Sequence, residues 1–210
     1  MQKTILYGNQ IQISEPLLIT EENAFLTEKF DCGNEVINHY LKSEAKKDTQ
    51  AVSFLITDEK KNAVIGYFAL SCSGFIIEFR GHPTIYPAVE IKMFAVDEAY
   101  QHIPYSDDPE DGTLSDIIFN YAISKIYDFT QKYCGADKVI LYAVPKAVNF
   151  YRKNFFSEFE TFHFVSQGKP PFLVPDGGAI RQILNDILHP TEERPPGLHL
   201  IPLNIPVLFL

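Results

Sequence analysis

The chain has 210 residues, of which 46% are hydrophobic and 21% are charged, and its formal net charge is −9 at pH 7. This length suits one domain with an appendage, and the apolar content, which includes 17 Phe and 11 Tyr, excludes a chain that is disordered throughout. Because the negative charge repels polyphosphates and no strong basic patch offsets it, we expect no nucleic-acid partner.

The first half of the chain predicts a helix followed by a β-hairpin. Apolar residues across 36–45 recur at helical spacing, and the polar and glycine residues at 31–34 suit the start of that helix. Strands are expected at 52–57 and 63–72, joined by a short polar turn.

A strand and a long loop are expected next. A stretch with Gly and Pro at 81–87 is interpreted as an irregular excursion, and the run at 89–97 as a partly buried strand. The segment 100–112 is rich in Pro, Asp and Glu, so we expect a loop there.

The remaining predicted elements alternate between helix and strand. Apolar residues across 114–133 follow a helical period, and Thr113 to Asp116 resembles a capping box. Further elements are expected as a strand at 138–144, a helix at 145–152 and a strand at 159–165. Alternation of this kind predicts an α/β fold whose sheet contains parallel strands.

A change in composition at residue 168 predicts two parts, a domain at 1–167 and a C-terminal extension at 168–210. Prolines and glycines in the extension surround one predicted helix at 179–188. Its apolar end, 198–210, is shorter than the roughly 20 residues of a membrane helix and contains two prolines. We therefore expect no membrane partner, and the extension to pack on the domain or on a partner, either a second copy or another protein.

The cysteine and histidine patterns indicate a reduced compartment and no metal. Cys32, Cys72 and Cys134 are widely separated and odd in number, which fits free thiols, and the N-terminus lacks the apolar run of a signal peptide. We expect a cytoplasmic protein. None of the six histidines has metal-ligand spacing.

Four stretches of this sequence resemble the GNAT N-acetyltransferases, and more narrowly the branch that contains the acetyltransferase toxins of bacterial toxin–antitoxin pairs. They lie at 30–41, 64–70, 94–101 and 147–156. The first is Phe-Asp-Cys-Gly-Asn with a later Asn and Leu, and the last resembles the family signature FY-x-x-x-GF. The resemblance implies a GNAT-like mixed twisted sheet with helices on both faces, and acetyl-CoA as co-substrate without a metal.

The resemblance also implies roles for individual residues. Tyr151 matches the tyrosine that protonates the departing thiolate, although an aromatic that fills the gap between helix and sheet is the alternative. The backbone at Phe94, Ala95 and Val96 matches the part of the strand that supports the thioester. Residues matched to contacts with the rest of the cofactor are Gln101, Asn149 and Arg152.

Glu90 is the candidate general base. It precedes Phe94 by four residues, so strict strand alternation would place both on one side, and burial could raise the pKa of this carboxyl. The alternative is a solvated carboxylate near the start of the strand.

The loop that should bind pyrophosphate departs from the family pattern, Gln/Arg-x-x-Gly-x-Gly/Ala. Gln101 is present, but Pro104 and Ser106 stand where the glycines would be, and four carboxylates follow. One explanation is a loop insertion, after which the backbone at the helix start restores the donors, at Gly112, Thr113, Leu114 and Ser115. The other explanation is a degenerate site.

These residues predict an enzyme that transfers an acetyl group directly from acetyl-CoA to a primary amine of a small molecule, peptide or protein. The first alternative is a toxin-like enzyme that acetylates aminoacyl-tRNA, against which the net charge argues. The second is a non-catalytic binding protein with a degenerate GNAT fold.

Overall fold

The structure is a computed structural model, and it describes residues 4–6, 11–79, 82–106, 108, 112–158 and 172–175. The chain forms two compact units: the first comprises 1–71 and 92–125, and the second 72–91 and 126–210. Three elements have residues in both units: β5 (Ala63–Phe79), β6 (His82–Val96) and α2 (Leu114–Lys132).

Antiparallel pairing dominates the first unit. The hairpin predicted at 52–72 is confirmed, because β4 (Val52–Asp58) pairs antiparallel with β5. The other strands of this unit flank β4 in the order β1–β2–β4, with β3 also paired to β4; they are β1 (Thr4–Leu6), β2 (Ile11–Ile13) and β3 (Leu17–Leu18).

The predicted N-terminal helix is present, but its second half is a π-helical turn. α1 (Glu35–His39) begins after Asn34, whose Oδ1 accepts hydrogen bonds from the backbone N–H groups of Val36 and Ile37. It continues as the π-helical turn η2 (Tyr40–Glu44), in which the N–H of Ala45 donates to the carbonyl of Tyr40 at 2.8 Å. Short 3₁₀ turns are η1 (Ala24–Thr27) and η3 (Glu98–Tyr100).

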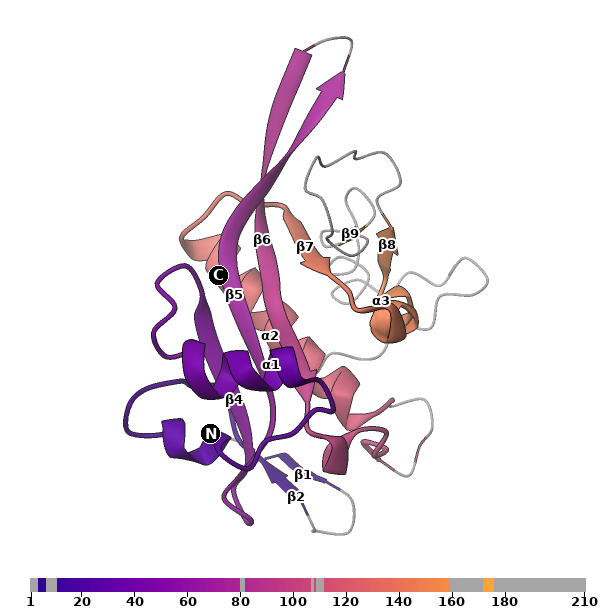
Figure 1. Ribbon diagram of the computed structural model, residues 1–210. Coiled ribbons are helices and arrows are strands. Elements are labelled where there is room, and N and C mark those ends of the chain that lie inside the picture. Colours follow the sequence, from indigo (N-terminus) through magenta and orange to yellow (C-terminus); the bar gives the residue numbers. More distant parts are fainter. Residues whose placement is uncertain are drawn as a thin grey trace. The chain divides into compact units, whose positions relative to one another are not determined.

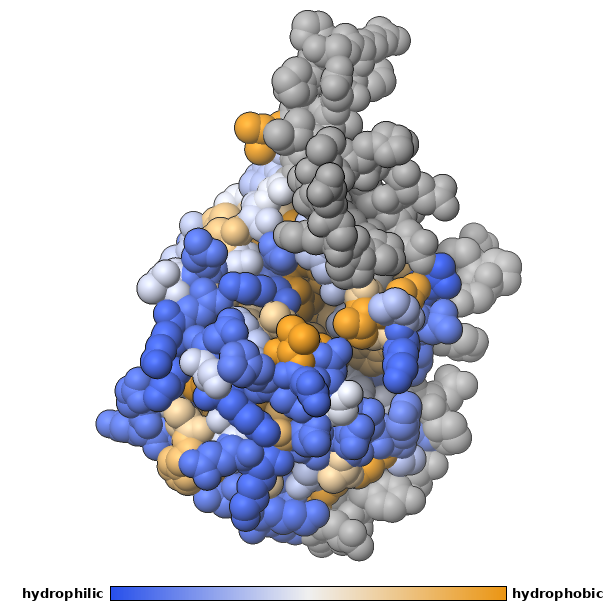
Figure 2. Space-filling view, in the orientation of Figure 1, coloured by the Kyte–Doolittle hydropathy of each residue, from blue (hydrophilic) through white to orange (hydrophobic). Residues whose placement is uncertain are grey.

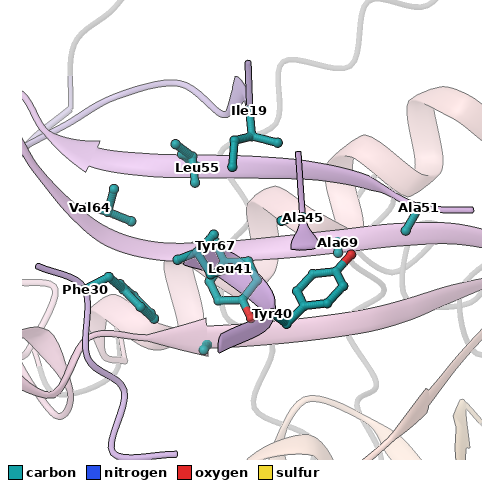
Figure 3. Close-up of a cluster of buried hydrophobic side chains, with 11 residues drawn as sticks. Ile19, Phe30, Tyr40, Leu41, Ala45, Ala51, Leu55, Val64, Tyr67 and Ala69 are labelled. Atoms are coloured by element: carbon teal, nitrogen blue, oxygen red, sulfur yellow. The ribbon is translucent and has the colours of Figure 1, made fainter. Parts of the chain in front are cut away.

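Two hydrophobic clusters cover the two faces of the sheet in the first unit. Figure 1 shows α1 on one side of these strands and α2 on the other. The cluster on the α2 side contains Ile11, Ile13, Ile56, Ile65, Phe68, Val96, Tyr100, Leu114, Ile118 and Ala122. The cluster on the α1 side, shown in Figure 3, contains Ile19, Phe30, Tyr40, Leu41, Ala45, Ala51, Leu55, Val64, Tyr67, Ala69 and Ala95.

One residue of the predicted apolar stripe does not join the core. Val36 is 73% exposed, because it lies in the first turn of α1, whereas Tyr40 and Leu41 are buried further along the chain. Among the coloured residues in Figure 2, most of those on this face are hydrophilic, and hydrophobic residues are exposed there in small groups.

The second unit alternates strand and helix as predicted. β7 (Lys138–Tyr142) runs parallel to β6, and the 3₁₀ turn η5 (Pro145–Ala147) leads into α3 (Val148–Lys153). Antiparallel strands complete the order β6–β7–β9–β8; they are β8 (Phe156–Glu158) and β9 (Phe172–Pro175). The predicted α/β fold with a mixed sheet is confirmed.

The prediction of an irregular excursion at 81–87 is wrong, because β6 already begins at His82. β6 pairs with β7 only from Ala88 onward, so Pro83 and Pro87 remove no donor from that ladder. Apart from β9, the C-terminal extension lies outside the described residues, as do the strand predicted at 159–165 and the helix predicted at 179–188.

Within the part of the chain that the structure describes, no helix is long and apolar enough to cross a membrane. The same residues contain no group of three or more side chains suited to hold a metal ion.

Candidate functional site

The first stretch of the family resemblance fastens the start of α1 to the end of β6. The N–H of Asp31 donates to Oδ2 of Asp97 at 2.9 Å, and the N–H of Glu98 donates to the carbonyl of Asp31 at 2.8 Å. The pKa of the Asp31 carboxyl is lowered by hydrogen bonds, first from the backbone of Gly33 and then from Asn38. These residues therefore build the frame of the site.

Gln101 braces the same region. Its Nε2 donates to the carbonyl of Val96 at 2.8 Å and to the carbonyl of Cys32 at 3.4 Å. The predicted cofactor contact of Gln101 therefore competes with two bonds inside the chain.

The side chains at the end of β6 belong to the core. The ring of Phe94 meets the ring of Phe119 edge to face at 5.2 Å, and Ala95 and Val96 are 7% and 5% exposed. A Cβ on Gly66 would lie 3.0 Å from the carbonyl oxygen of Ala95, so the two strands approach closely there. The backbone is thus the part of residues 94–96 that is left for chemistry.

The described residues on either side of the acidic stretch are paired with each other. Pro104 and Thr113 form an isolated antiparallel bridge, and the N–H of Tyr105 donates to the carbonyl of Gly112 at 3.0 Å. If the loop is set aside, Gly112 follows Ile103 directly and takes the first glycine position of the family pattern. Its φ of +77° is one that glycine adopts without strain. This geometry favours an insertion.

The start of α2 carries the predicted capping box, which is confirmed. The N–H and Oγ1 of Thr113 both donate to Oδ2 of Asp116 at 2.8 Å, and Asp116 is 1% exposed. The N–H of Leu114 donates to the carbonyl of Ile103 at 2.8 Å. Two of the predicted pyrophosphate donors are therefore already bonded within the chain, and a carboxylate lies in the first turn of the helix.

Tyr151 lies on α3 and is only 6% exposed. Its ring meets Phe150 edge to face at 5.3 Å and lies 6.1 Å from the ring of Phe156. Burial raises the pKa of the phenol above its ordinary value, so Tyr151 keeps its proton at neutral pH. That state suits a proton donor.

Asn149 and Arg152 are exposed neighbours on the same helix. Nη1 of Arg152 donates to Oδ1 of Asn149 at 3.3 Å. The bond between them gives the pair one preferred geometry.

Glu90 pairs in register with Ile140 of β7 and is half-buried. Burial, followed by the charge of Glu90, raises the pKa of Tyr142. Strict alternation does not place Glu90 on the side of Phe94, because Lys92 and Met93 both contact residues on the α1 side whereas Phe94 packs on the α2 side.

No family model matches the chain, and no curated protein matches it in sequence. Solved structures do match. The KacTA–DNA complex has a TM-score of 0.60 at 21% identity, over 83% of this chain and 99% of that chain. AtaT complexed with acetyl-methionyl-tRNAfMet has a TM-score of 0.60 at 16% identity, over 82% and 99%. AtaTR bound with acetyl-CoA has a TM-score of 0.61 at 17% identity, over 82% and 98%.

These structures contradict our expectations about partners. Proteins of this fold have been solved with DNA, with an antitoxin and with an acetylated aminoacyl-tRNA, so the expectations of no nucleic-acid partner and of a small-molecule or peptide amine are wrong. The net charge was a poor guide to a nucleic-acid partner because it is a sum over the whole chain, whereas binding depends on local charge. At these identities the likeness concerns the fold: the chain has the fold of the GNAT acetyltransferases of toxin–antitoxin systems.

Proposed function

We propose that this protein is an acetyl-CoA-dependent N-acetyltransferase of the cytoplasm, and that its acceptor is the amino group of an aminoacyl-tRNA. The observation that carries the proposal is the pairing of the described residues on either side of the acidic stretch, which brings Gly112 to the family spacing after Gln101. The likeness to AtaT, which was solved with acetyl-CoA and with acetyl-methionyl-tRNAfMet, supports both the donor and the acceptor.

The donor supplies a thioester, whose carbonyl carbon is attacked by the neutral amine while the carbon–sulfur bond breaks. We assign the backbone of Phe94, Ala95 and Val96 to support of the thioester, and Tyr151 to protonation of the sulfur. The attacking amine loses its proton through a water molecule to the carboxylate of Glu90, the proposed base. Proposed contacts with the rest of the cofactor are Gln101, Gly112, Thr113, Leu114, Ser115, Asn149 and Arg152.

Two observations favour the role proposed for Tyr151. AtaT and KacT were both solved as mutants in which a tyrosine is replaced by phenylalanine. In this chain, the phenol of Tyr151 is protonated at neutral pH, as an acid requires, and burial raises its pKa further.

The fit to the pyrophosphate is partial. Gly112 has a suitable backbone, but the amides of Thr113 and Leu114 already have acceptors inside the chain. Binding therefore requires these amides to exchange partners, or the ligand to use the remaining donors.

Thermal unfolding with acetyl-CoA tests the donor. A ligand at a hundred times its Kd stabilises the folded state by about 2.7 kcal/mol, which raises Tm by roughly 5–10 °C for a chain of this size. Transfer of labelled acetyl groups to aminoacyl-tRNA, with deacylated tRNA as the control, tests the acceptor. The absence of a Tm shift at millimolar acetyl-CoA would exclude the enzyme.

The second candidate is a binding protein that keeps the fold without catalysis. The buried Asp116 favours it, because this carboxylate occupies donors at the helix start and opposes a phosphate there. This candidate predicts no stabilisation by acetyl-CoA, so the same experiment separates the two.

A further inference from the structure

Lys92 is an unexpected residue at its position in β6, and it was not among the predicted site residues. Ile91 beside it is 3% exposed, whereas the Lys92 side chain is 30% exposed. Its Nζ lies 2.6 Å from Oδ2 of Asp48 and 5.5 Å from the ring centroid of Tyr40. Since a well-packed apolar residue could replace such a partly buried pair without loss of stability, the fold alone does not explain the pair.

Asp48 holds the ammonium of Lys92 in place. Its carboxylate also accepts hydrogen bonds from the Tyr40 hydroxyl at 2.8 Å and from the Gln50 N–H at 2.9 Å. Burial acts to raise the pKa of this carboxyl, but the hydrogen bonds, led by the one from Lys92, outweigh it and lower the pKa. The carboxyl of Asp48 is therefore charged at neutral pH.

The π-helical turn η2 positions Tyr40, which contacts both Asp48 and Lys92. It places the ring of Tyr40 in a stacked arrangement with the ring of Tyr67, with 6.5 Å between centroids. Figure 3 shows both rings in the cluster on the α1 side, with the hydroxyl of Tyr40 directed away from Tyr67. π-helical turns occur frequently at functional sites because they shift one residue out of helical register.

Asp48 and Lys92 line an open groove of about 350 Å³. It is lined by Ser43, Glu44, Lys47, Asp48, Thr49, Gln50 and Lys92. The lining has two acidic and two basic side chains. A phosphate would meet both signs equally, whereas a ligand group with an ammonium and a carbonyl oxygen close together can satisfy both.

The groove also lies at a suitable place along β6. Lys92 precedes Phe94 by two residues, which is about 7 Å of strand. In the proposed function the cofactor reaches residues 94–96 from the loop that follows β6. An acceptor that approaches from the preceding part of the strand would pass Lys92.

We propose that this groove binds the α-aminoacyl group of the acceptor before transfer, with its ammonium near Glu44 and Asp48 and its carbonyl oxygen at Lys92, and that the amine loses a proton as it leaves these carboxylates to attack the thioester. The proposal rests on the proposed function. Lys92 has two ammonium protons beyond the one given to Asp48, so it can donate to a ligand without losing the ion pair. Lys92 is thus a positioning residue, set by Asp48.

The direct test is calorimetric titration without acetyl-CoA. The probe is the α-aminoacyl amide of 3′-amino-3′-deoxyadenosine, a stable form of an aminoacylated RNA end. Its N-acetylated form lacks the ammonium, and we expect it to bind at least about tenfold more weakly. Equal binding of the two forms, or no binding at millimolar probe, would overturn the proposal.

Two variants locate the site. Glu44→Gln removes an exposed carboxylate, and Asp48→Asn combined with Lys92→Gln removes the pair without leaving one charge unpaired. Each should weaken the probe severalfold or more, whereas the controls Glu35→Gln and Lys42→Gln should not. Unchanged binding in both site variants would overturn the proposal.

Kinetics separate positioning from folding. The double variant should raise KM for aminoacyl-tRNA and leave KM for acetyl-CoA unchanged. A general loss of folded protein would change neither KM value, so a raised KM for the acceptor alone indicates lost positioning. Acetyl-CoA binding, measured on the same samples, judges the proposed function by itself. If acetyl-CoA binds and the probe does not, the groove proposal alone fails; if the probe binds and acetyl-CoA does not, only the proposed function fails.

Discussion

Tyr151 is buried against two phenylalanine rings, and its raised pKa keeps it protonated. Replacement of Tyr151 by Phe keeps the ring and removes the proton, so the packing of α3 should survive. We expect kcat to fall by about a hundredfold or more, as for the loss of a general acid, while Kd for acetyl-CoA changes little. Steady-state kinetics and calorimetry on the same sample measure the two quantities.

Tyr133→Phe is the matched control, because Tyr133 is 79% exposed and has no assigned role. It should leave both kcat and Kd unchanged. Unaltered turnover in Tyr151→Phe would remove Tyr151 from the role of acid and leave it as a core residue.

Asp116 places a buried carboxylate at the start of α2, where the proposed pyrophosphate site also lies, so two negative groups would meet there. Asp116→Asn keeps an oxygen for the Thr113 donors and removes the charge. We expect acetyl-CoA to bind severalfold more tightly, and the stability of the folded protein to fall by about 1 kcal/mol or less, the usual worth of a cap. Titration calorimetry and urea unfolding provide the two measurements.

Asp128→Asn removes an equal charge later on the same helix, where the side chain is exposed. Twelve residues of helix correspond to about 18 Å, so this control should hardly affect binding. Weaker acetyl-CoA binding in Asp116→Asn would mean that the carboxylate supports the site by holding the helix start in shape.

At the scale of elements, the acidic loop depends on its final glycine. Gly112 has a φ of +77°, and a Cβ there would lie 2.9 Å from Oδ2 of Asp116. Gly112→Ala should therefore destabilise the protein by about 1–3 kcal/mol, through backbone strain and the displaced cap. Gly135→Ala is the control, because a Cβ at Gly135 meets no atom within 4 Å. Equal midpoints of urea unfolding for the two variants would contradict this account of the loop.

Elements with a regular apolar period could be predicted from the sequence. The hairpin at 52–72 and the helix from Leu114 repeat a local pattern over many residues, so each turn or pair adds to the same signal. The π-helical turn η2 was not predicted, because its only mark in the apolar period is a single five-residue step from Tyr40 to Ala45, which also fits a looser helical stripe. The strand at 82–87 was missed because its prolines are tolerated only in the part of β6 that does not pair with β7. Which part pairs depends on the fold.

The candidate site divides in the same way. Gln101 and Tyr151 could be proposed from the sequence because the family motifs fix their types and spacing. That Thr113 and Leu114 already use their amides could not be read from the sequence, since it depends on which oxygen lies nearby after folding. Lys92 did leave a signal, a lysine inside an apolar strand, but its partner Asp48 is distant in sequence.

At the scale of the whole molecule, a chain with net charge −9 must still bind an RNA if the proposed function holds. The mixed lining of the groove resolves part of this conflict, because recognition of an aminoacyl group needs few phosphate contacts. The long-range field remains repulsive, so the approach of the RNA gains no help from steering.

This charge balance predicts a shallow salt dependence for the binding of aminoacyl-tRNA. Each phosphate contact with a single strand contributes a slope of about −0.7 in log K against log salt, so one to three contacts lower the affinity by less than about a hundredfold between roughly 50 and 200 mM salt. Deacylated tRNA should bind more weakly with the same slope, because the aminoacyl group makes no phosphate contact. Fluorescence anisotropy with labelled tRNA measures both curves. A slope near −10 would mean that phosphates dominate the interface and that basic side chains outside this groove carry the binding.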